Sequence, residues 1–190
     1  MGADALGKET QVRAFFGLPL PEAHKEALDR YIGVCAAVAP DFRWTPGTNL
    51  HVTIRFLGHV ELALAEGVAE AVASMQPSGF ELRLGQVGTF KRGRLARVVW
   101  LGVSAGEHEM AELARAVEAE CVRAGLESEA RRFTAHLTLA RARRREGAPA
   151  PSFSAPPDLP AWRATELILY RSRLGRGGSV YEPLRTISLG

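Results

Sequence analysis

Cysteine is scarce in this chain of 190 residues, where only Cys35 and Cys121 occur. Both lie in alanine-rich stretches with a helical pattern, and neither belongs to a C-x-x-C motif. Disulfide scaffolds carry more cysteines in a short chain, so we expect two buried free thiols in a reducing cytoplasm.

Long apolar runs are also missing. No stretch approaches the roughly 20 apolar residues of a membrane span, and the N-terminus lacks the basic and then apolar pattern of a signal peptide. Leu6 stands where a myristoylation signal requires Ser or Thr. We therefore expect a soluble, cytoplasmic monomer that binds no membrane, with a flexible leader over residues 1–10 and a single domain over residues 11–190.

Lysine is scarce as well, with 3 lysines among 24 basic residues, and the net charge is only +3. So small a net charge can influence how the protein associates with charged partners, but it does not indicate which reaction the protein catalyses. Genome composition or thermal adaptation explains the arginines as readily as phosphate recognition does.

Apolar periodicity and turn residues predict an alternation of strands and helices. Helices are expected over residues 22–39, 61–75 and 106–124. Strands are expected over residues 12–18, 50–58, 80–90, 95–103, 164–172 and 180–189, and from His136 onward. Residues 143–160 are rich in Arg, Pro, Ala and Ser and are expected to form an exposed loop without a core of its own.

Two short strands carry the same polar pair. The stretch LHVTIRFLG begins at Leu50, and HLTLAR begins at His136. Strand alternation predicts that His51, Thr53 and Arg55 share one face, and that Val52, Ile54 and Phe56 form a core face. By the same alternation His136 and Thr138 share one face of the later strand.

These motifs recur in similar surroundings. Phe16 precedes His51 by 35 residues, and Trp100 precedes His136 by 36, with a helix expected in each interval. The similarity suggests a duplicated unit. Two such lobes that face each other across a cleft would bring the two histidines together.

Paired imidazoles can act as general base and general acid near neutral pH. The neighbouring hydroxyls can donate hydrogen bonds to phosphate oxygens during in-line displacement at phosphorus. Metal binding is the rival interpretation, but two histidines without Asp, Glu or Cys at ligand spacing are too few for a first-row metal. His24, His59 and His108 lack this context and are expected at the surface.

HVTIRFLG and HLTLAR resemble the paired H-x-T-x motifs of the two-histidine phosphoesterase superfamily, and within it the RNA 2',3'-cyclic phosphodiesterases, also called 2'-5' RNA ligases. The similarity runs from about Val12 to Leu189 and includes FFGLPLPEAHKEAL and LILYRSRLGRGGSVYEPL. It implies an α+β, bilobed, pseudo-two-fold fold, in which antiparallel sheets line a central cleft and the helices lie outside.

The resemblance also implies the chemistry. RNA ending in a 2',3'-cyclic phosphate is hydrolysed to a 2'-phosphomonoester without a metal or other cofactor, and reversible 2'-5' joining is possible. Carried onto this sequence, His51 donates the proton to the 3' oxygen and His136 activates water. Thr53 and Thr138 hold the phosphate. The chain departs from the pattern at Ala135, where Pro is common, and at Arg55, where Lys is frequent.

Two alternatives stay open. The same site could act on 2',5'-linked oligonucleotides or small cyclic nucleotide phosphates, or the protein could be a non-catalytic module that binds RNA ends. Strict alternation turns Arg141 away from His136, so a role for it in catalysis would need a bulge. The run Arg143–Arg145 suits RNA contact or a solvated loop equally, and Trp44, Trp100, Trp162, Phe133 and Tyr181 could stack on bases or belong to the core.

Overall fold

The computed structural model describes residues 10–175 and 178–190. Its helices are α1 (Glu22–Val38), α2 (Leu62–Ser74) and α3 (Glu107–Arg123), with a short 3-10 helix η1 (Gly47–Asn49). Its strands are β1 (Gln11–Pro19), β2 (Phe42–Trp44), β3 (His51–Glu61), β4 (Phe80–Arg92), β5 (Leu95–Ala105), β6 (His136–Ala142), β7 (Trp162–Ala164), β8 (Glu166–Gly175) and β9 (Gly178–Ser188). The leader expected over residues 1–10 lies, apart from Thr10, outside the described residues.

All strand pairs among the described residues are antiparallel. The strand order is β7-β4-β5-β6-β3-β1-β8-β9, and β2 pairs with β6 outside this path. The two halves of the sheet meet at β3 and β6, where the register pairs Val52 with Leu137. Each of these residues follows the histidine of one motif, so the catalytic candidates lie at the junction.

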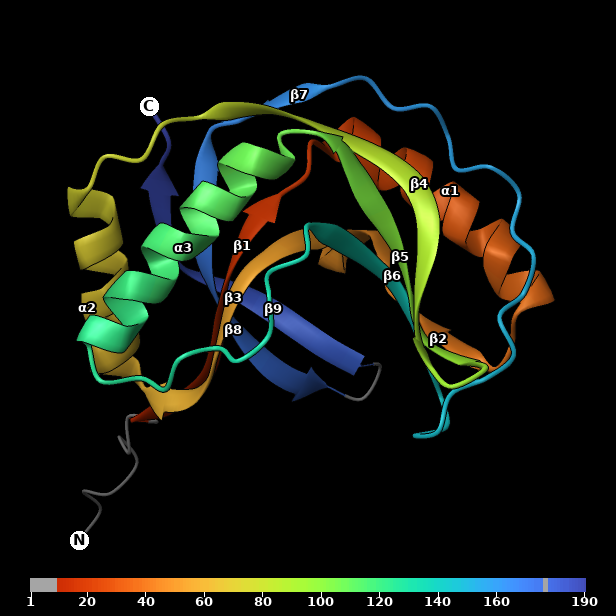
Figure 1. The fold of residues 1–190 in the computed structure, drawn as a ribbon, viewed down its shortest axis with the longest axis horizontal. Helices are drawn as coiled ribbons and strands as arrows, with labels where there is room; N and C mark the ends of the chain where they lie inside the picture. Colours follow the sequence, from red (N-terminus) through yellow and green to blue (C-terminus); the bar gives the residue numbers. More distant parts are fainter. Residues whose placement is uncertain (1–9, 176–177) are drawn as a thin grey trace, which may run out of the picture.

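The repeated order seen in the sequence is present in the fold. In the first half, β1 and β3 pair with each other and are joined through α1. In the second half, β5 and β6 pair and are joined through α3. Figure 1 shows α2 and α3 beside each other at one side of the molecule and α1 at the opposite side, so the helices lie outside the sheet. The expected α+β class is confirmed.

Helix α1 illustrates how the sequence specifies these elements. Pro21 precedes its first residue, a position where the missing N–H of proline costs nothing. Its buried residues Leu28, Tyr31, Ile32 and Cys35 recur at intervals of three and four, which places them on one helical face. Cys121 lies on the buried face of α3, and both cysteines are free and buried, as expected.

The segment 143–160 was expected to be exposed, and this prediction is wrong in part. Ala148 is buried and exchanges two backbone hydrogen bonds with Ala96, at 2.8 and 2.9 Å. Leu159 is also buried. The Tyr31 hydroxyl on α1 donates to the carbonyl of Ser154 at 2.8 Å. Composition alone missed these contacts because they depend on partners far away in the sequence.

His24 corrects a second prediction. It was expected at the surface, but it is 5% exposed and its Nε2 lies 2.9 Å from the carbonyl oxygen of Pro160. Its ring also packs edge-on against Trp162. Short β2, η1 and β7 were not predicted either, because three-residue elements carry too little periodicity to be recognised.

Candidate functional site

His51 and His136 begin the two strands at the junction of the sheet. The antiparallel pair between Val52 and Leu137 sets the register. Continuing it by one residue in each direction places each histidine beside the threonine of the other motif. The structure therefore brings together the four residues singled out from the sequence: His51, Thr53, His136 and Thr138.

The imidazole of His51 is held on several sides. Its Nδ1 lies 2.7 Å from the carbonyl oxygen of Asn49, and its Nε2 lies 3.1 Å from Oγ1 of Thr53. The ring of Phe15 lies 4.7 Å from it, and the ring of Tyr181 meets it edge-on at 5.0 Å. Gly17 makes this packing possible, because a Cβ there would lie only 3.2 Å from Cδ2 of His51.

His136 has an equivalent arrangement. Its Nδ1 lies 2.7 Å from the carbonyl oxygen of Thr134, two residues earlier in the chain, as Asn49 is two residues before His51. Phe90 meets the ring edge-on at 4.9 Å, and Trp100 lies at 6.4 Å. The two histidines are thus held in the same local geometry by the two halves of the fold.

These contacts fix the tautomers. A carbonyl oxygen can only accept, so Nδ1 of both histidines must carry a proton and donate it. In the neutral form Nε2 of each ring then carries a lone pair that can accept a proton, and on His51 it accepts a hydrogen bond from the hydroxyl of Thr53. Burial lowers the pKa of His51 to about 4, against a carbonyl hydrogen bond that raises it, and the nearby Arg141 and His136 lower it further. Burial also lowers the pKa of His136, and Arg141 acts in the same direction.

Strand β3 departs from the alternation expected after Thr53. Gly17 of β1 pairs with Thr53, and Phe16, which precedes Gly17, pairs with Arg55. Ile54 therefore has no partner in β1 and is an extra residue in β3. This β-bulge exchanges the two faces. The expectation that Arg55 shares the face of His51 and that Phe56 lies in the core is therefore wrong. Arg55 pairs with Glu118 of α3, and Phe56 is 47% exposed.

Arg141 is a residue whose place sequence reasoning missed. Trp100 pairs with Thr138 and the preceding Val99 with Ala140, so Leu139 is an extra residue in β6. The bulge returns Arg141 to the face of His136, and the guanidinium is close enough to lower the pKa of both histidines. The only sequence signal for it was Leu139 and Ala140 in succession, which are both buried.

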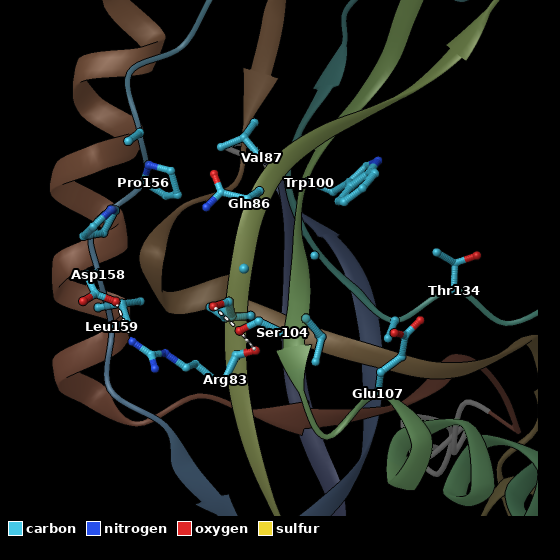
Figure 2. Close-up of a pocket in the computed structure, with 17 residues that line it drawn as sticks. Arg83, Gln86, Val87, Trp100, Ser104, Glu107, Thr134, Pro156, Asp158 and Leu159 are labelled. Atoms are coloured by element: carbon cyan, nitrogen blue, oxygen red, sulfur yellow. Dashed lines mark hydrogen bonds and ion pairs between the residues drawn. The ribbon is translucent and has the colours of Figure 1, made fainter.

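A cavity of about 310 Å³ opens directly at the motifs. Thr53 and His136 both contribute to its wall, so it spans the junction between the two halves. A larger cavity of about 740 Å³ lies farther along β4 and β5 and contains none of the four motif residues. Figure 2 shows that Trp100 and Thr134 lie on one side of this larger cavity and Pro156 and Asp158 on the other.

Of the aromatic candidates, Trp100 and Tyr181 lie beside the histidines. Trp44 instead donates its Nε1 proton to the carbonyl of Ala39 at 3.2 Å, and Trp162 packs on His24. Phe133 lines the 310 Å³ cavity.

The remaining polar candidates lie elsewhere. His59 and His108 are exposed, as expected. Arg143, Arg144 and Arg145 are also exposed, and Arg143 donates to the carbonyl of Pro40 at 3.0 Å. Within residues 10–175 and 178–190, no three His, Cys, Asp or Glu side chains come together as a metal site. No helix of the described chain is long and apolar enough to cross a membrane.

Comparison with known proteins identifies the class. The crystal structure of Escherichia coli LigT complexed with 3'-AMP superimposes with a TM-score of 0.79 at 28% identity and covers 94% of this chain and 98% of that one. An RNA 2',3'-cyclic phosphodiesterase of E. coli K12 is 30% identical over 180 residues, 93% of this chain and 96% of that protein. One from Geobacillus stearothermophilus is 30% identical over 164 residues, 84% of this chain. The chain spans about half of that longer relative, 52%. Fold and motif site together define an enzyme class, the phosphoesterases of this architecture.

The family follows from a further match. The model of the 2'-5' RNA ligase superfamily matches residues 21–176. This protein therefore belongs to the 2'-5' RNA ligase superfamily, and the resemblance noted in the sequence is confirmed.

Proposed function

We propose that this protein is a hydrolase that opens 2',3'-cyclic phosphates at RNA 3' ends and leaves a 2'-phosphomonoester. The observation that carries the proposal is the paired geometry of His51 and His136, each with Nδ1 donating to a carbonyl and with Nε2 as the nitrogen that can exchange a proton; on His51 this Nε2 accepts from the hydroxyl of Thr53. The relatives named as RNA 2',3'-cyclic phosphodiesterases support the choice of substrate.

In the proposed reaction His136 accepts a proton at Nε2 from water, whose oxygen forms a new bond to phosphorus. The bond between phosphorus and O3' breaks, and His51 donates a proton from Nε2 to O3'. A 3'-hydroxyl and a 2'-phosphate result. The assignment of acid to His51 and base to His136 follows the family resemblance, because the two rings have equivalent surroundings.

Three further side chains would stabilise the phosphate. Thr53 and Thr138 can donate their hydroxyl protons to the non-bridging oxygens, where charge develops in the transition state. The guanidinium of Arg141 supplies a fixed positive charge on the same face. No residue of this set needs a metal or cofactor to act.

Because the pKa values of both histidines are lowered, the histidine that acts as the acid needs an interaction that favours its protonated form. In the free protein both imidazoles are neutral near pH 7, because burial and Arg141 disfavour their charged forms. A bound phosphate monoanion acts in the opposite direction, since a negative charge beside an imidazole favours its protonated form. Binding of the substrate phosphate would therefore favour the protonated imidazole that donates the proton to O3'.

The same residues can catalyse 2'-5' joining. A 5'-hydroxyl would replace water, lose its proton to His136 and form a bond to phosphorus, while O3' leaves with a proton from His51. Water and the RNA 5'-hydroxyl would compete as nucleophiles, so the concentration of RNA 5' ends would determine the share of joining relative to hydrolysis.

The test is hydrolysis of an RNA oligomer that ends in a 2',3'-cyclic phosphate, with excess EDTA. We expect a 2'-phosphate product from the wild type and losses of at least about 10²-fold in His51→Ala and in His136→Ala. His59→Ala is the matched control, because His59 is exposed on the same strand as His51. A wild type that is inactive in EDTA and restored by a divalent cation would refute the proposal.

A binding assay and two further substrates, applied to the same proteins, decide between the alternatives. Binding of RNA ends without product release would indicate a non-catalytic module. Faster turnover of 2',5'-linked oligonucleotides or of free cyclic nucleotides would change the substrate but keep the site. A monomeric state and a cytoplasmic location remain predictions, which sedimentation and cell fractionation test.

A further inference from the structure

Asn49 connects the imidazole of His51 to β9, the strand at one end of the sheet. The backbone carbonyl of Asn49 accepts from Nδ1 of His51 at 2.7 Å. Its side-chain Nδ2 donates to the backbone carbonyl of Ser179 on β9 at 2.6 Å. Because a carbonyl oxygen only accepts, this contact also determines which end of the amide faces β9. One residue therefore contacts both the imidazole and a strand that carries neither motif.

The backbone of Asn49 depends on such a contact because it ends a helix of only three residues, η1. Hydrogen bonds in 3-10 helices have poorer geometry than those in α-helices. The peptide group that follows Asn49 is held by the N–H of Leu50, which donates to the carbonyl of Gly47 at 3.1 Å. The N–H of Gly47 in turn donates to Oδ1 of Asp29 on α1 at 2.8 Å. Helix η1 is thus attached to α1 at its beginning and to β9 at its end.

Strand β9 contacts His51 a second time through Tyr181. This residue lies two positions after Ser179 on the same strand, and its ring meets the imidazole edge-on at 5.0 Å. A shift of β9 would therefore move both the ring of Tyr181 and the carbonyl that holds the amide of Asn49. The orientation of His51 depends on β9 at both points.

His136 lacks this second support. Its Nδ1 lies 2.7 Å from the carbonyl oxygen of Thr134, which matches the contact of His51 with Asn49. The side chain of Thr134 is exposed, however, and within residues 10–175 and 178–190 it makes no hydrogen bond. The proposed acid is thus held more firmly than the proposed base. This difference suits the two roles, because the acid donates to an oxygen fixed within the substrate, whereas the base receives a proton from a water molecule that can adjust its position.

We propose that Asn49 is a positioning residue for the general acid. Its amide, held by β9, fixes the peptide group that orients the imidazole of His51 towards the leaving oxygen. The inference rests on the proposed function, since it concerns proton donation in the same reaction. It extends the machinery of that reaction to a strand outside the two motifs.

The experiment compares Asn49→Ala with the wild type in hydrolysis of an RNA end that carries a 2',3'-cyclic phosphate. Misplacement of a reacting group by about 1 Å can cost about 10²-fold in rate. We therefore expect kcat of Asn49→Ala to fall about 10- to 10²-fold, with KM changed by less than about twofold. Thr48→Ala is the matched control, because Thr48 is the exposed neighbour of Asn49 in η1, and it should keep the wild-type kcat.

The pH dependence of kcat gives a readout that a loss of stability alone would not change. Burial lowers the pKa of His51, and the hydrogen bond to the carbonyl of Asn49 acts against this. A weaker hydrogen bond should lower the pKa further. The alkaline limb of the profile, where the acid loses its proton, should therefore move to lower pH in Asn49→Ala. The other titratable groups around His51 are unchanged in this variant, namely His136, Arg141, Tyr170 and Tyr181.

A second measurement does not depend on the reaction. In NMR spectra at about pH 7, the Nδ1 proton of His51 should exchange with water faster in Asn49→Ala than in the wild type. The Nδ1 proton of His136 should exchange at the same rate in both proteins, which also shows that the variant is folded.

The outcomes separate the two proposals. Asn49→Ala with the wild-type kcat and pH profile, or with unchanged exchange of the His51 proton, would overturn the positioning role and leave the proposed hydrolase intact. Wild-type protein that fails to hydrolyse the cyclic-phosphate end would overturn the proposed function itself. The NMR comparison would then still decide whether Asn49 holds the imidazole.

Discussion

Replacement of His51 by Gln should change how the stability of this protein depends on pH. Burial of the imidazole lowers its pKa to about 4, whereas an unfolded chain titrates near its ordinary value of about 6.5. As the pH falls below about 6.5, the unfolded state therefore binds a proton before the folded state does. This favours unfolding at acid pH, and the effect disappears above about pH 7.5.

The magnitude follows from the difference between the two pKa values. One pKa unit corresponds to about 1.4 kcal/mol, so protonation of the unfolded chain at His51 should cost about 3 kcal/mol of unfolding free energy between pH 7.5 and pH 4. His51→Gln has no titrating group at this position. Its unfolding free energy should therefore fall less than that of the wild type over this range, by about 3 kcal/mol.

Urea unfolding followed by tryptophan fluorescence at several pH values measures this difference. Comparing pH slopes removes any loss of packing in the variant that does not depend on pH. His59→Gln, on the same strand but exposed, should keep the wild-type slope. Equal slopes for His51→Gln and wild type would refute the reasoning, because they would mean that the buried imidazole takes up its proton as readily as in the unfolded chain.

Three other predictions concern the surroundings of the site. Arg141→Gln removes a cation that lowers both histidine pKa values, so both limbs of the pH–rate profile should move to higher pH, and kcat/KM should fall about 10²-fold; an unmoved profile would contradict this. Gly17→Ala places a Cβ 3.2 Å from Cδ2 of His51 and should lower kcat about tenfold with a stability loss of about 1 kcal/mol, measured by steady-state kinetics and urea unfolding. Arg55→Met leaves Glu118 without its partner and should cost about 1–3 kcal/mol in urea unfolding, whereas a loss of nothing would show that the ion pair is only a surface contact.

Much of the architecture could be predicted from the sequence because it depends on local pattern. The helical period of α1 and the doubled H-x-T motif each occupy a short window, and they predicted the helix and the paired strands. The repeat predicted that two similar lobes bring the two histidines together, but it did not predict the pairing of Val52 with Leu137 through which the strands meet.

Other features depend on partners that are distant in the sequence. His24 is buried because Pro160 and Trp162 cover it, and nothing near His24 in the chain signals this. Ala148 joins Ala96 across more than fifty residues through backbone groups, which carry no sequence signature. Contacts of this kind between distant segments determine which residues are buried, and the periodicity of the local sequence does not reveal them.

The bulges explain why strict alternation gave the wrong orientation for side chains beyond the threonine of each motif. Up to the threonine, both motif strands obey it, and the two halves of the fold present matching His and Thr side chains. Directly beyond the threonine each strand inserts an extra residue, Ile54 in β3 and Leu139 in β6, and β3 inserts a second one, Leu57, further along. The residue inserted directly beyond the threonine moves Phe56 to the face of His51 and Arg141 to the face of His136. Symmetry thus supplies two equivalent proton-transfer groups, while the different residues behind the bulges place an aromatic surface on one side and a positive charge on the other. Because of this difference the two sides of the site are not equivalent. The site can therefore fix the orientation of an asymmetric nucleotide, which a symmetric pair of histidines alone could not do.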